Sequence, residues 1–165
     1  MAVWSRPRFD MSKTKQVYRN GESQIVIQDL IRSDSGKFTC TADNQVAQPQ
    51  TKKANLVVKY FAGIDKSRQY AKAGGKHGDT VTLICKAEGT PEMQFTWLKE
   101  DTELQSNSKY AISSTSAADI FDTKFKSELT VRSIAKADYG TYTCKARNDR
   151  GEDQFNIRLN GTIRC

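Results

Sequence analysis

The chain has 165 residues and a formal net charge of +7, from 26 Lys plus Arg, 19 Asp plus Glu and one neutral His, and 37% of it is hydrophobic. This polar composition indicates a thin core. A single histidine cannot form a His-rich metal site, no Gly-rich phosphate loop is present, and no apolar run approaches the ~18–20 residues that cross a bilayer. Residues 1–10 also lack the apolar region of a signal peptide. The sequence therefore predicts no catalytic residues, no metal site, no cofactor and no membrane insertion in this segment.

Residues 1–62 contain short segments with the period of a β-strand. Asn20-Gly21, a strong hairpin signal, separates two of them. Residues Ser23–Leu30 and Gly36–Asn44 alternate apolar and polar side chains, as half-buried strands do. In the second segment, Phe38 and Cys40 are expected to face the same side of the strand, toward the core.

The pattern recurs 104 residues further along the chain. Nine residues of the first half have counterparts of similar type at this one offset, without a gap. The pairs are Ile25 and Leu129, Ile27 and Val131, Leu30 and Ile134, Asp34 and Asp138, Gly36 and Gly140, Phe38 and Tyr142, Cys40 and Cys144, Ala42 and Ala146, and Asn44 and Asn148. The repeat predicts two tandem all-β domains, joined by a short link without a Gly/Ser-rich tract.

Two motifs connect these copies to a known family. The motif Asp-x-Gly-x-Tyr-x-Cys occupies Asp138–Cys144, and it recurs at Asp34–Cys40 with Phe in place of Tyr. In the second copy Cys85 precedes Trp97 by 12 residues and Cys144 by 59. With these residues the chain resembles the immunoglobulin superfamily, in particular its I-set domains. The resemblance implies two tandem immunoglobulin-like β-sandwiches.

The resemblance also assigns roles to single residues. It implies a disulfide between Cys85 and Cys144 that packs on Trp97. It places the corner hydrogen bond of the family at Tyr142, and Phe38, which has no hydroxyl, is expected to forgo this bond, worth about 1 kcal/mol. The expected core residues are Trp4, Trp97, Phe38, Tyr142, Asp34 and Asp138.

By this resemblance the first copy, residues 1–62, is a partial domain that contains strands C to G. Its strand C tryptophan is Trp4, which lies 36 residues before Cys40. Strands A and B and the first disulfide cysteine of the family are then absent. Three explanations stay open: the chain is a fragment or truncated product, it recruits the missing strands from a partner, or Trp4 is misassigned. If the chain begins at Met1, an isolated polypeptide of residues 1–62 is expected to fold poorly.

The second copy, residues 63–165, is expected to be a complete I-set domain with a long insertion between strands C and E. Trp97 and Cys144 are 47 residues apart, which is 11 more than the spacing in the first copy. The extra length falls near Ser106–Lys124 and forms either an additional edge strand or a long loop. Loops of this kind more often vary neutrally than bind, although they also carry recognition residues.

The remaining cysteines and one sequon bear on the compartment. Cys40 has lost its family partner, and Cys165 is expected to pair with downstream sequence or with a second chain. Paired cysteines indicate an oxidising compartment. The sequon at Asn160, just after the predicted strand G, is a candidate glycosylation site. The expected location is extracellular or at the cell surface, and the alternative is the reduced cytosol of the sarcomere, where titin-like I-set modules occur.

Positive charge is concentrated in the first copy, because residues 1–62 carry 10 basic and 5 acidic side chains whereas residues 63–165 carry 16 and 14. Alternation along strands C, F and G predicts a polar, basic outer face on each domain. This candidate binding face comprises Lys37, Lys53, Lys59, Lys145, Arg147 and Arg158. It is either a solvated surface that maintains solubility, or a contact face for an acidic protein surface or a sulfated glycosaminoglycan. Nucleic-acid binding is not expected, since no aromatic side chains interleave the basic ones.

Tandem I-set domains resemble parts of neural and muscle cell-surface adhesion and guidance receptors. Residues 42–60 are similar to the same region of insect neuronal adhesion proteins of the lachesin and klingon families, although Ala47 replaces the usual Gly. The expected function is therefore a non-enzymatic adhesion or recognition module that binds another immunoglobulin-type protein, homophilically or heterophilically. The alternative is a structural module of a sarcomeric, titin-like protein. No nucleophile with a suitably placed base supports an enzyme.

Overall fold

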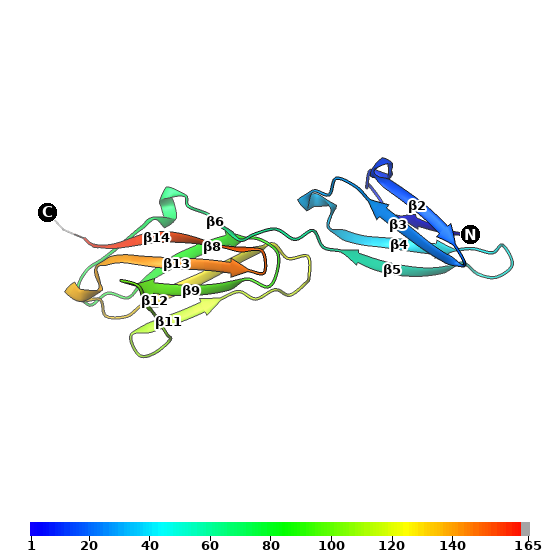
Figure 1. Ribbon diagram of the computed structural model, residues 1–165. Helices are drawn as coiled ribbons and strands as arrows, with labels where there is room; N and C mark the ends of the chain where they lie inside the picture. Colours follow the sequence, from blue (N-terminus) through cyan, green and yellow to red (C-terminus); the bar gives the residue numbers. More distant parts are fainter. Residues whose placement is uncertain (163–165) are drawn as a thin grey trace. The chain divides into compact units, whose positions relative to one another are not determined.

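The computed structural model describes residues 1–162, which form strands and the turns that join them, and it confirms the all-β prediction (Figure 1). Cys165, for which a disulfide partner outside the chain is expected, lies outside the described residues. The chain divides into two compact units, unit 1 (Met1–Val58) and unit 2 (from Lys59 onward). The sequence placed the boundary four residues later. Residues 59–62 belong with unit 2, because the carbonyl oxygen of Tyr60 accepts a hydrogen bond from Asn148 Nδ2 (2.8 Å) and Ala62 is fully buried in the core of unit 2.

Unit 1 contains two small antiparallel sheets. Its strands are β1 (Ala2–Ser5), β2 (Thr14–Arg19), β3 (Glu22–Ile27), β4 (Gly36–Ala42) and β5 (Gln50–Leu56), with 3-10 turns at Met11–Lys13 and Arg32–Asp34. One sheet has the order β1-β4-β5, and the other consists of β2 and β3. The predicted hairpin joins β2 to β3, since Asn20 and Gly21 have φ angles of 51° and 80° and Arg19 pairs with Glu22.

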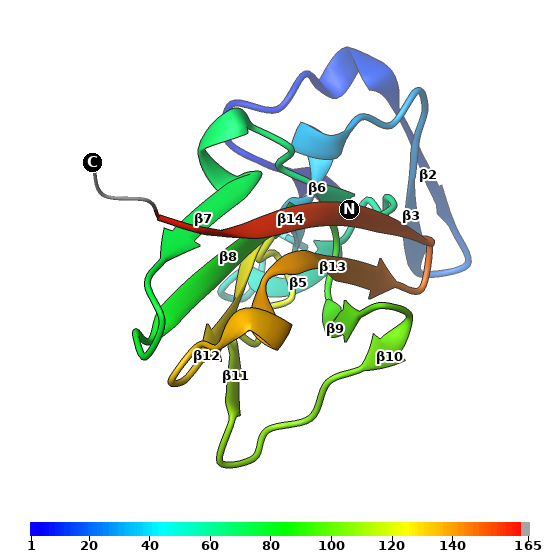
Figure 2. The ribbon, with the colours of Figure 1, turned by 90° about the vertical axis from the view of Figure 1, so that its left-hand side faces the viewer.

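Unit 2 is a sandwich of a five-stranded and a four-stranded sheet. Its strands are β6 (Gly63–Ile64), β7 (Lys72–Gly75), β8 (Val81–Glu88), β9 (Gln94–Lys99), β10 (Thr102–Glu103), β11 (Tyr110–Ser114), β12 (Lys124–Val131), β13 (Gly140–Asn148) and β14 (Gly151–Gly161), with 3-10 turns at Arg68–Tyr70 and Lys136–Asp138. The sheets have the orders β10-β9-β13-β14-β7 and β11-β12-β8-β6. Figure 2 shows β14 between β13 and the parallel strand β7.

The strand registers show which elements of the two units correspond. Trp4 pairs with Cys40 between β1 and β4, as Trp97 pairs with Cys144 between β9 and β13. Strands β2 and β3 correspond to β11 and β12, and β5 corresponds to β14. This register supports Trp4 as the strand C tryptophan. Residues 1–58 contain no counterpart of β6, β7 or β8.

The 11 additional residues of unit 2 fall in two places. The number of positions between corresponding residues of the two units shows where. It is 93 for Trp4 and Trp97, 96 for Thr14 and Tyr110, and 104 from β3 onward. Three residues are therefore added before β11 and eight between β11 and β12. The second group replaces the two-residue hairpin of unit 1 with a loop over residues 115–123. Within the predicted range Ser106–Lys124 the structure forms the long loop, and an additional edge strand, β10, lies just before this range.

The corner hydrogen bond has a substitute in unit 1. In unit 2 the hydroxyl of Tyr142 donates to the carbonyl oxygen of Asp138 at 2.8 Å. In unit 1 the guanidinium of Arg6 lies 5.2 Å from the ring centroid of Phe38 and donates to the carbonyl oxygens of Asp34 and Ser35, the latter at 2.8 Å. As expected, Phe38 makes no such bond, but the carbonyl oxygen that the bond would reach, that of Asp34, accepts instead from Arg6, the residue that follows β1.

Glycine makes room for this arginine. A Cβ on Gly36 would lie 2.5 Å from Arg6 Cζ, and Gly36 has a φ of 154°. Phe9 packs edge-on against Phe38 with ring centroids 5.0 Å apart, so that only 2% of Phe38 is exposed. The ring and the guanidinium together close one end of unit 1.

An aspartate–lysine pair recurs in both units at the same turn. Asp34 accepts hydrogen bonds from Lys13 Nζ (2.5 Å) and the Ile31 N–H (2.8 Å). Asp138 accepts them from Lys109 Nζ (2.6 Å) and the Ala135 N–H (2.7 Å). The Lys13 contact lowers the pKa of Asp34 from its ordinary value. Burial opposes ionisation of Asp138, but its hydrogen bonds outweigh this cost and its pKa is also lowered.

The interior of unit 1 is sparse. Of its apolar side chains only Phe38 is buried, whereas Trp4, Ile25 and Ile27 are half-buried. The amide of Gln16 joins the two sheets, since its Oε1 accepts from the Trp4 N–H (2.9 Å) and its Nε2 donates to the Trp4 carbonyl oxygen (3.2 Å). Unit 1 therefore depends on polar contacts more than unit 2 does.

We expect Arg6→Ala to destabilise unit 1 by about 2 kcal/mol, because two carbonyl oxygens lose a charged donor. Adding Phe38→Tyr in that background should recover about 1 kcal/mol, since the new hydroxyl can reach the Asp34 carbonyl oxygen as Tyr142 reaches its counterpart. Hydrogen exchange of the amides of residues 31–38 measures both effects. The control is Arg8→Ala at the exposed neighbour. Equal protection in the Arg6 and Arg8 variants would contradict the assignment.

The two aspartates predict an acid-sensitive stability. A carboxylate whose pKa is lower in the folded state adds stability above its unfolded pKa, about 3.9, and this stability is lost as pH falls through the folded pKa. We expect the melting temperature to fall steeply below about pH 4. Lys109→Met should lower it at neutral pH and reduce this acid dependence in unit 2. A parallel downward shift at every pH would show that the ion pair does not contribute.

Candidate functional site

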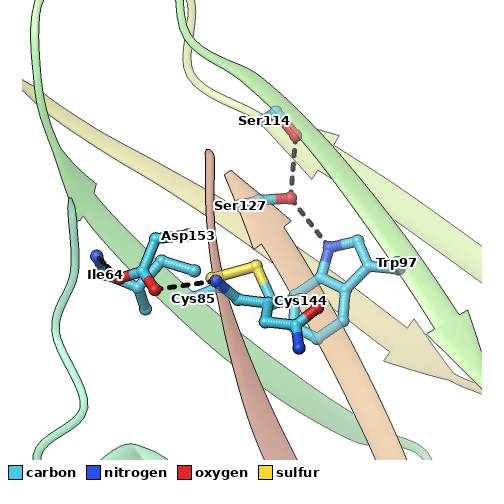
Figure 3. The surroundings of a disulfide bond; sticks show 8 residues. Ile64, Cys85, Trp97, Ser114, Ser127, Cys144 and Asp153 are labelled. Carbon is cyan, nitrogen blue, oxygen red and sulfur yellow. Dashed lines mark hydrogen bonds between the residues drawn. A yellow bond between two sulfur atoms is a disulfide. The ribbon is translucent and has the colours of Figure 1, made fainter. Parts of the chain in front are cut away.

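The core of unit 2 is built around the disulfide (Figure 3). Cys85 and Cys144 are bonded, and their strands belong to opposite sheets. The buried Trp97 lies beside them and donates from Nε1 to Ser127 Oγ at 2.9 Å, and Ser127 also contacts Ser114 Oγ at 2.8 Å. Every buried polar side-chain atom in the part of the chain that the structure describes has a partner. The interior is therefore structural, with no polar group left free for chemistry.

Burial also raises the pKa of the Tyr142 hydroxyl, so this phenol stays neutral at every physiological pH. Within residues 1–162 no group of His, Cys, Asp and Glu side chains could hold a metal ion. No helix among these residues is long and apolar enough to span a membrane. The outer faces of the sheets, which carry the predicted basic residues, are the candidate sites.

The outer face of the β1-β4-β5 sheet of unit 1 is here called the lysine face. Cross-strand register defines its rows, which run from an aliphatic end to a cationic end. Its residues are Val3, Thr41 and Thr51 in the first row, Ser5, Thr39 and Lys53 in the second, and Lys37 and Asn55 in the third. Val3 is 43% exposed, and Val46 in the β4–β5 turn is 89% exposed. The face contains two ammonium groups, and one exposed carboxylate, Asp43, borders its aliphatic end directly after β4.

The outer face of the five-stranded sheet of unit 2 is here called the mixed face. Lys145 pairs with Gln154, and Arg147 lies directly opposite Glu152. Glu103 lies opposite Leu98 on the neighbouring strand. The sequence predicted a polar, basic face here, and the structure adds acidic side chains to it. Cross-strand pairing with Glu152 therefore compensates part of its positive charge.

Two predicted site residues lie elsewhere than expected. Lys59 is not on the outer face of the first domain, because β5 ends at Leu56 and Lys59 Nζ contacts Asp149 at 2.5 Å within unit 2. Asn160 lies inside β14 rather than just after it, because the strand continues to Gly161 and pairs with β7. The other predicted basic residues, Lys37, Lys53, Lys145, Arg147 and Arg158, lie on outer faces.

A shallow groove of about 680 Å³ lies on the other sheet of unit 2. Its charged lining residues are Lys86, Lys124, Lys126, Asp65 and Glu88. Lys126 pairs with Glu128 at 2.8 Å, and Lys86 lies over the ring of Tyr70 at 5.1 Å. Two of the three lysines of this groove, Lys86 and Lys126, already have partners, so it is a weaker binding site than the lysine face.

The long loop of unit 2 is ordered by its own aspartates. Asp122 Oδ2 accepts from the Ala118 and Asp119 N–H groups at 2.8 and 3.0 Å, and Asp119 Oδ1 accepts from the Phe121 N–H at 2.8 Å. Ile120 is left 49% exposed between them. The loop presents one apolar side chain, and no cluster of residues accompanies it.

Two members of the lysine face and one residue of the adjoining turn were missed by the sequence analysis. Val3 and Thr51 extend its aliphatic end, and Val46 lies in the adjoining turn. Alternation from Trp4 and Cys40 would have placed Val3 on this face. The residues of β5 carried no such signal, because Gln50–Leu56 has no apolar alternation.

A known protein family matches both units of the chain. The sequence profile of the immunoglobulin I-set domain matches residues 3–58 and 67–160. The chain belongs to the immunoglobulin I-set family. This confirms the resemblance seen in its cysteine and tryptophan motifs and the two tandem domains that it implied.

Curated relatives come from both expected classes. The chain is 30% identical over 149 residues to limbic system-associated membrane protein of Gallus gallus, covering 90% of this chain and 41% of that protein. It is 31% identical over 137 residues to lachesin of Drosophila melanogaster, covering 83% and 37%. It is also 31% identical over 137 residues to the muscle M-line assembly protein unc-89 of Caenorhabditis elegans, covering 83% and 2%. The chain thus spans about two fifths or less of these relatives.

Solved structures have the same fold. One chain of the crystal structure of Dpr2 Ig1-Ig2 in complex with DIP-Theta Ig1-Ig3 matches with a TM-score of 0.73 and 21% identity, covering 98% of this chain and 54% of that one. The I-band fragment I67-I69 of titin matches with a TM-score of 0.61 and 26% identity, covering 99% and 55%. The first likeness is evidence for the fold alone.

Proposed function

We propose that the chain is an extracellular or cell-surface recognition module, without enzymatic activity, that binds other proteins in cell adhesion. It binds through the outer faces of its sheets, with an immunoglobulin-type protein as partner. The disulfide between Cys85 and Cys144 carries this proposal, because disulfides persist in oxidising compartments and are rare in the cytosol. Closing a loop of 59 residues stabilises the domain by about 4 kcal/mol, a large share of the stability of a small domain.

Two of the relatives favour this location and role. One is named as a membrane protein of the limbic system, and lachesin belongs to the family that residues 42–60 already resembled. A sulfated glycosaminoglycan is the weaker ligand, because Lys37 and Lys53 form a pair and not a row along the sheet.

A structural role in the sarcomere is the second candidate. The similarity to unc-89, named as a muscle M-line assembly protein, and to the I-band fragment I67-I69 of titin favours it. In that setting the outer faces would be solvated spacers and Cys85 and Cys144 would be thiols. The two candidates therefore differ in the oxidation state of one cysteine pair.

A thiol assay on the protein from its native source separates the candidates. We expect Cys85 and Cys144 to resist alkylation in denaturant until a reductant is added, because they are bonded. Alkylation after reduction is the control for access to both residues. Full labelling of the pair without reductant would reject the extracellular location and favour the sarcomeric candidate.

Glycosylation at Asn160 is the second expected outcome. Asn160 is partly exposed on β14, and its Oδ1 accepts a hydrogen bond from Arg158 Nε at 3.0 Å. We expect a chain secreted from eukaryotic cells to lose mass on treatment with peptide N-glycosidase, and Thr162→Ala to abolish that loss. Thr143→Ala, outside the sequon, is the matched control. An unmodified Asn160 in the secreted chain would contradict the prediction.

A binding screen tests recognition itself. The chain, tetramerised to raise its avidity, is applied to a panel of purified ectodomains of immunoglobulin-type cell-surface proteins. We expect specific capture of at least one ectodomain, and none by titin I67-I69 tetramerised in the same way. The absence of any specific capture would reject the recognition role.

A further inference from the structure

The lysine face of unit 1 has more positive than negative charge, since its one bordering carboxylate, Asp43, lies at the end opposite the two lysines. Lys53 pairs with Thr39, and Lys37 pairs with Asn55, so the two lysines are diagonal neighbours on adjacent strands at roughly 7–8 Å. Both are exposed, and neither takes part in an ion pair with a described residue. At the other end of the face Val3, Thr41 and Thr51 present methyl groups. The face therefore combines an aliphatic region with two uncompensated ammonium groups.

A second copy of this face is a poor partner. In a two-fold symmetric contact each residue meets a residue of the same face. Each copy then offers one bordering carboxylate, Asp43, to the two ammonium groups of Lys37 and Lys53. At least one lysine of each copy therefore lies against a lysine, a hydroxyl or a methyl group, and its desolvation cost is not offset.

The mixed face of a second copy is not a better partner. It presents Glu103 and Glu152, but Glu152 already lies opposite Arg147. Its basic residues outnumber these two acids; they are Lys72, Lys145, Arg147 and Arg158. The lysine face and the mixed face are thus both net positive, so contact between them brings like charges together.

We propose that the lysine face binds a different protein, and that this partner presents an aliphatic centre flanked by at least two carboxylates. Contact is heterophilic: the carboxylates meet Lys37 and Lys53, and the apolar centre covers Val3 and the threonine methyl groups. This arrangement gives the apolar core and polar rim of a specific interface. The inference rests on the proposed recognition function and names the partner chemistry of its face.

The test compares three forms of the whole chain against the ectodomain that the tetramer captures. The charge-reversed variant K37E/K53E is expected to bind at least about tenfold more weakly, because both ammonium groups now face carboxylates of the partner. Binding of the unmodified chain should weaken as salt is raised. The control K15E/K76E makes the same change in net charge at two exposed lysines outside both faces and should bind normally. Sedimentation velocity should find the unmodified chain monomeric.

Four other outcomes would overturn the proposal. Capture that is unchanged in K37E/K53E rejects the lysine face while leaving the recognition function intact. Self-association that K37E/K53E abolishes shows a homophilic face. A sulfated glycan is the ligand if the unmodified chain and the control are retained on heparin, K37E/K53E is not, and no ectodomain binds through the face. Failure to capture any ectodomain rejects the proposal together with the proposed function.

The melting temperatures of the three forms are the control for folding. Equal values show that the substitutions do not unfold the chain.

Discussion

Each unit depends on the pairing of its tryptophan strand with its central cysteine strand. Trp4 lies opposite Cys40, and Trp97 lies opposite Cys144, in the same register. This register sets which side chains of the neighbouring strands face inward, because a strand alternates faces with period two. The core, the corner contacts and the outer faces all follow from it.

The two units satisfy the same constraint with different chemistry. Unit 2 uses a disulfide, an indole hydrogen bond to Ser127 and a tyrosine hydroxyl. In unit 1 the guanidinium of Arg6 bonds the corner carbonyl oxygens, and the amide of Gln16 joins the two sheets. Side-chain hydrogen bonds thus take over part of the role that apolar burial has in unit 2. Such bonds add less stability than a closed core, which agrees with the half-buried state of Trp4.

The fold was predictable because its signals are local. The offset of 104, the hairpin dipeptide and the cysteine and tryptophan spacings depend on residue types at fixed distances. The substitute for the corner bond was not predictable, since Arg6 and Phe38 are 32 positions apart and meet only after β1 pairs with β4. Lys59 was misplaced for a similar reason, because alternation cannot tell where a strand ends. The acidic members of the mixed face became visible only with the cross-strand register.

The bridge made by Gln16 has a further consequence for unit 1. A strand at the edge of a sheet offers unpaired N–H and C=O groups to any other extended chain, which is a route to aggregation. The Trp4 N–H and carbonyl oxygen on the outer edge of β1 are already bonded by the Gln16 amide. One glutamine side chain therefore acts as a short stand-in for a neighbouring strand and blocks edge-to-edge growth of this small sheet at its most apolar residue.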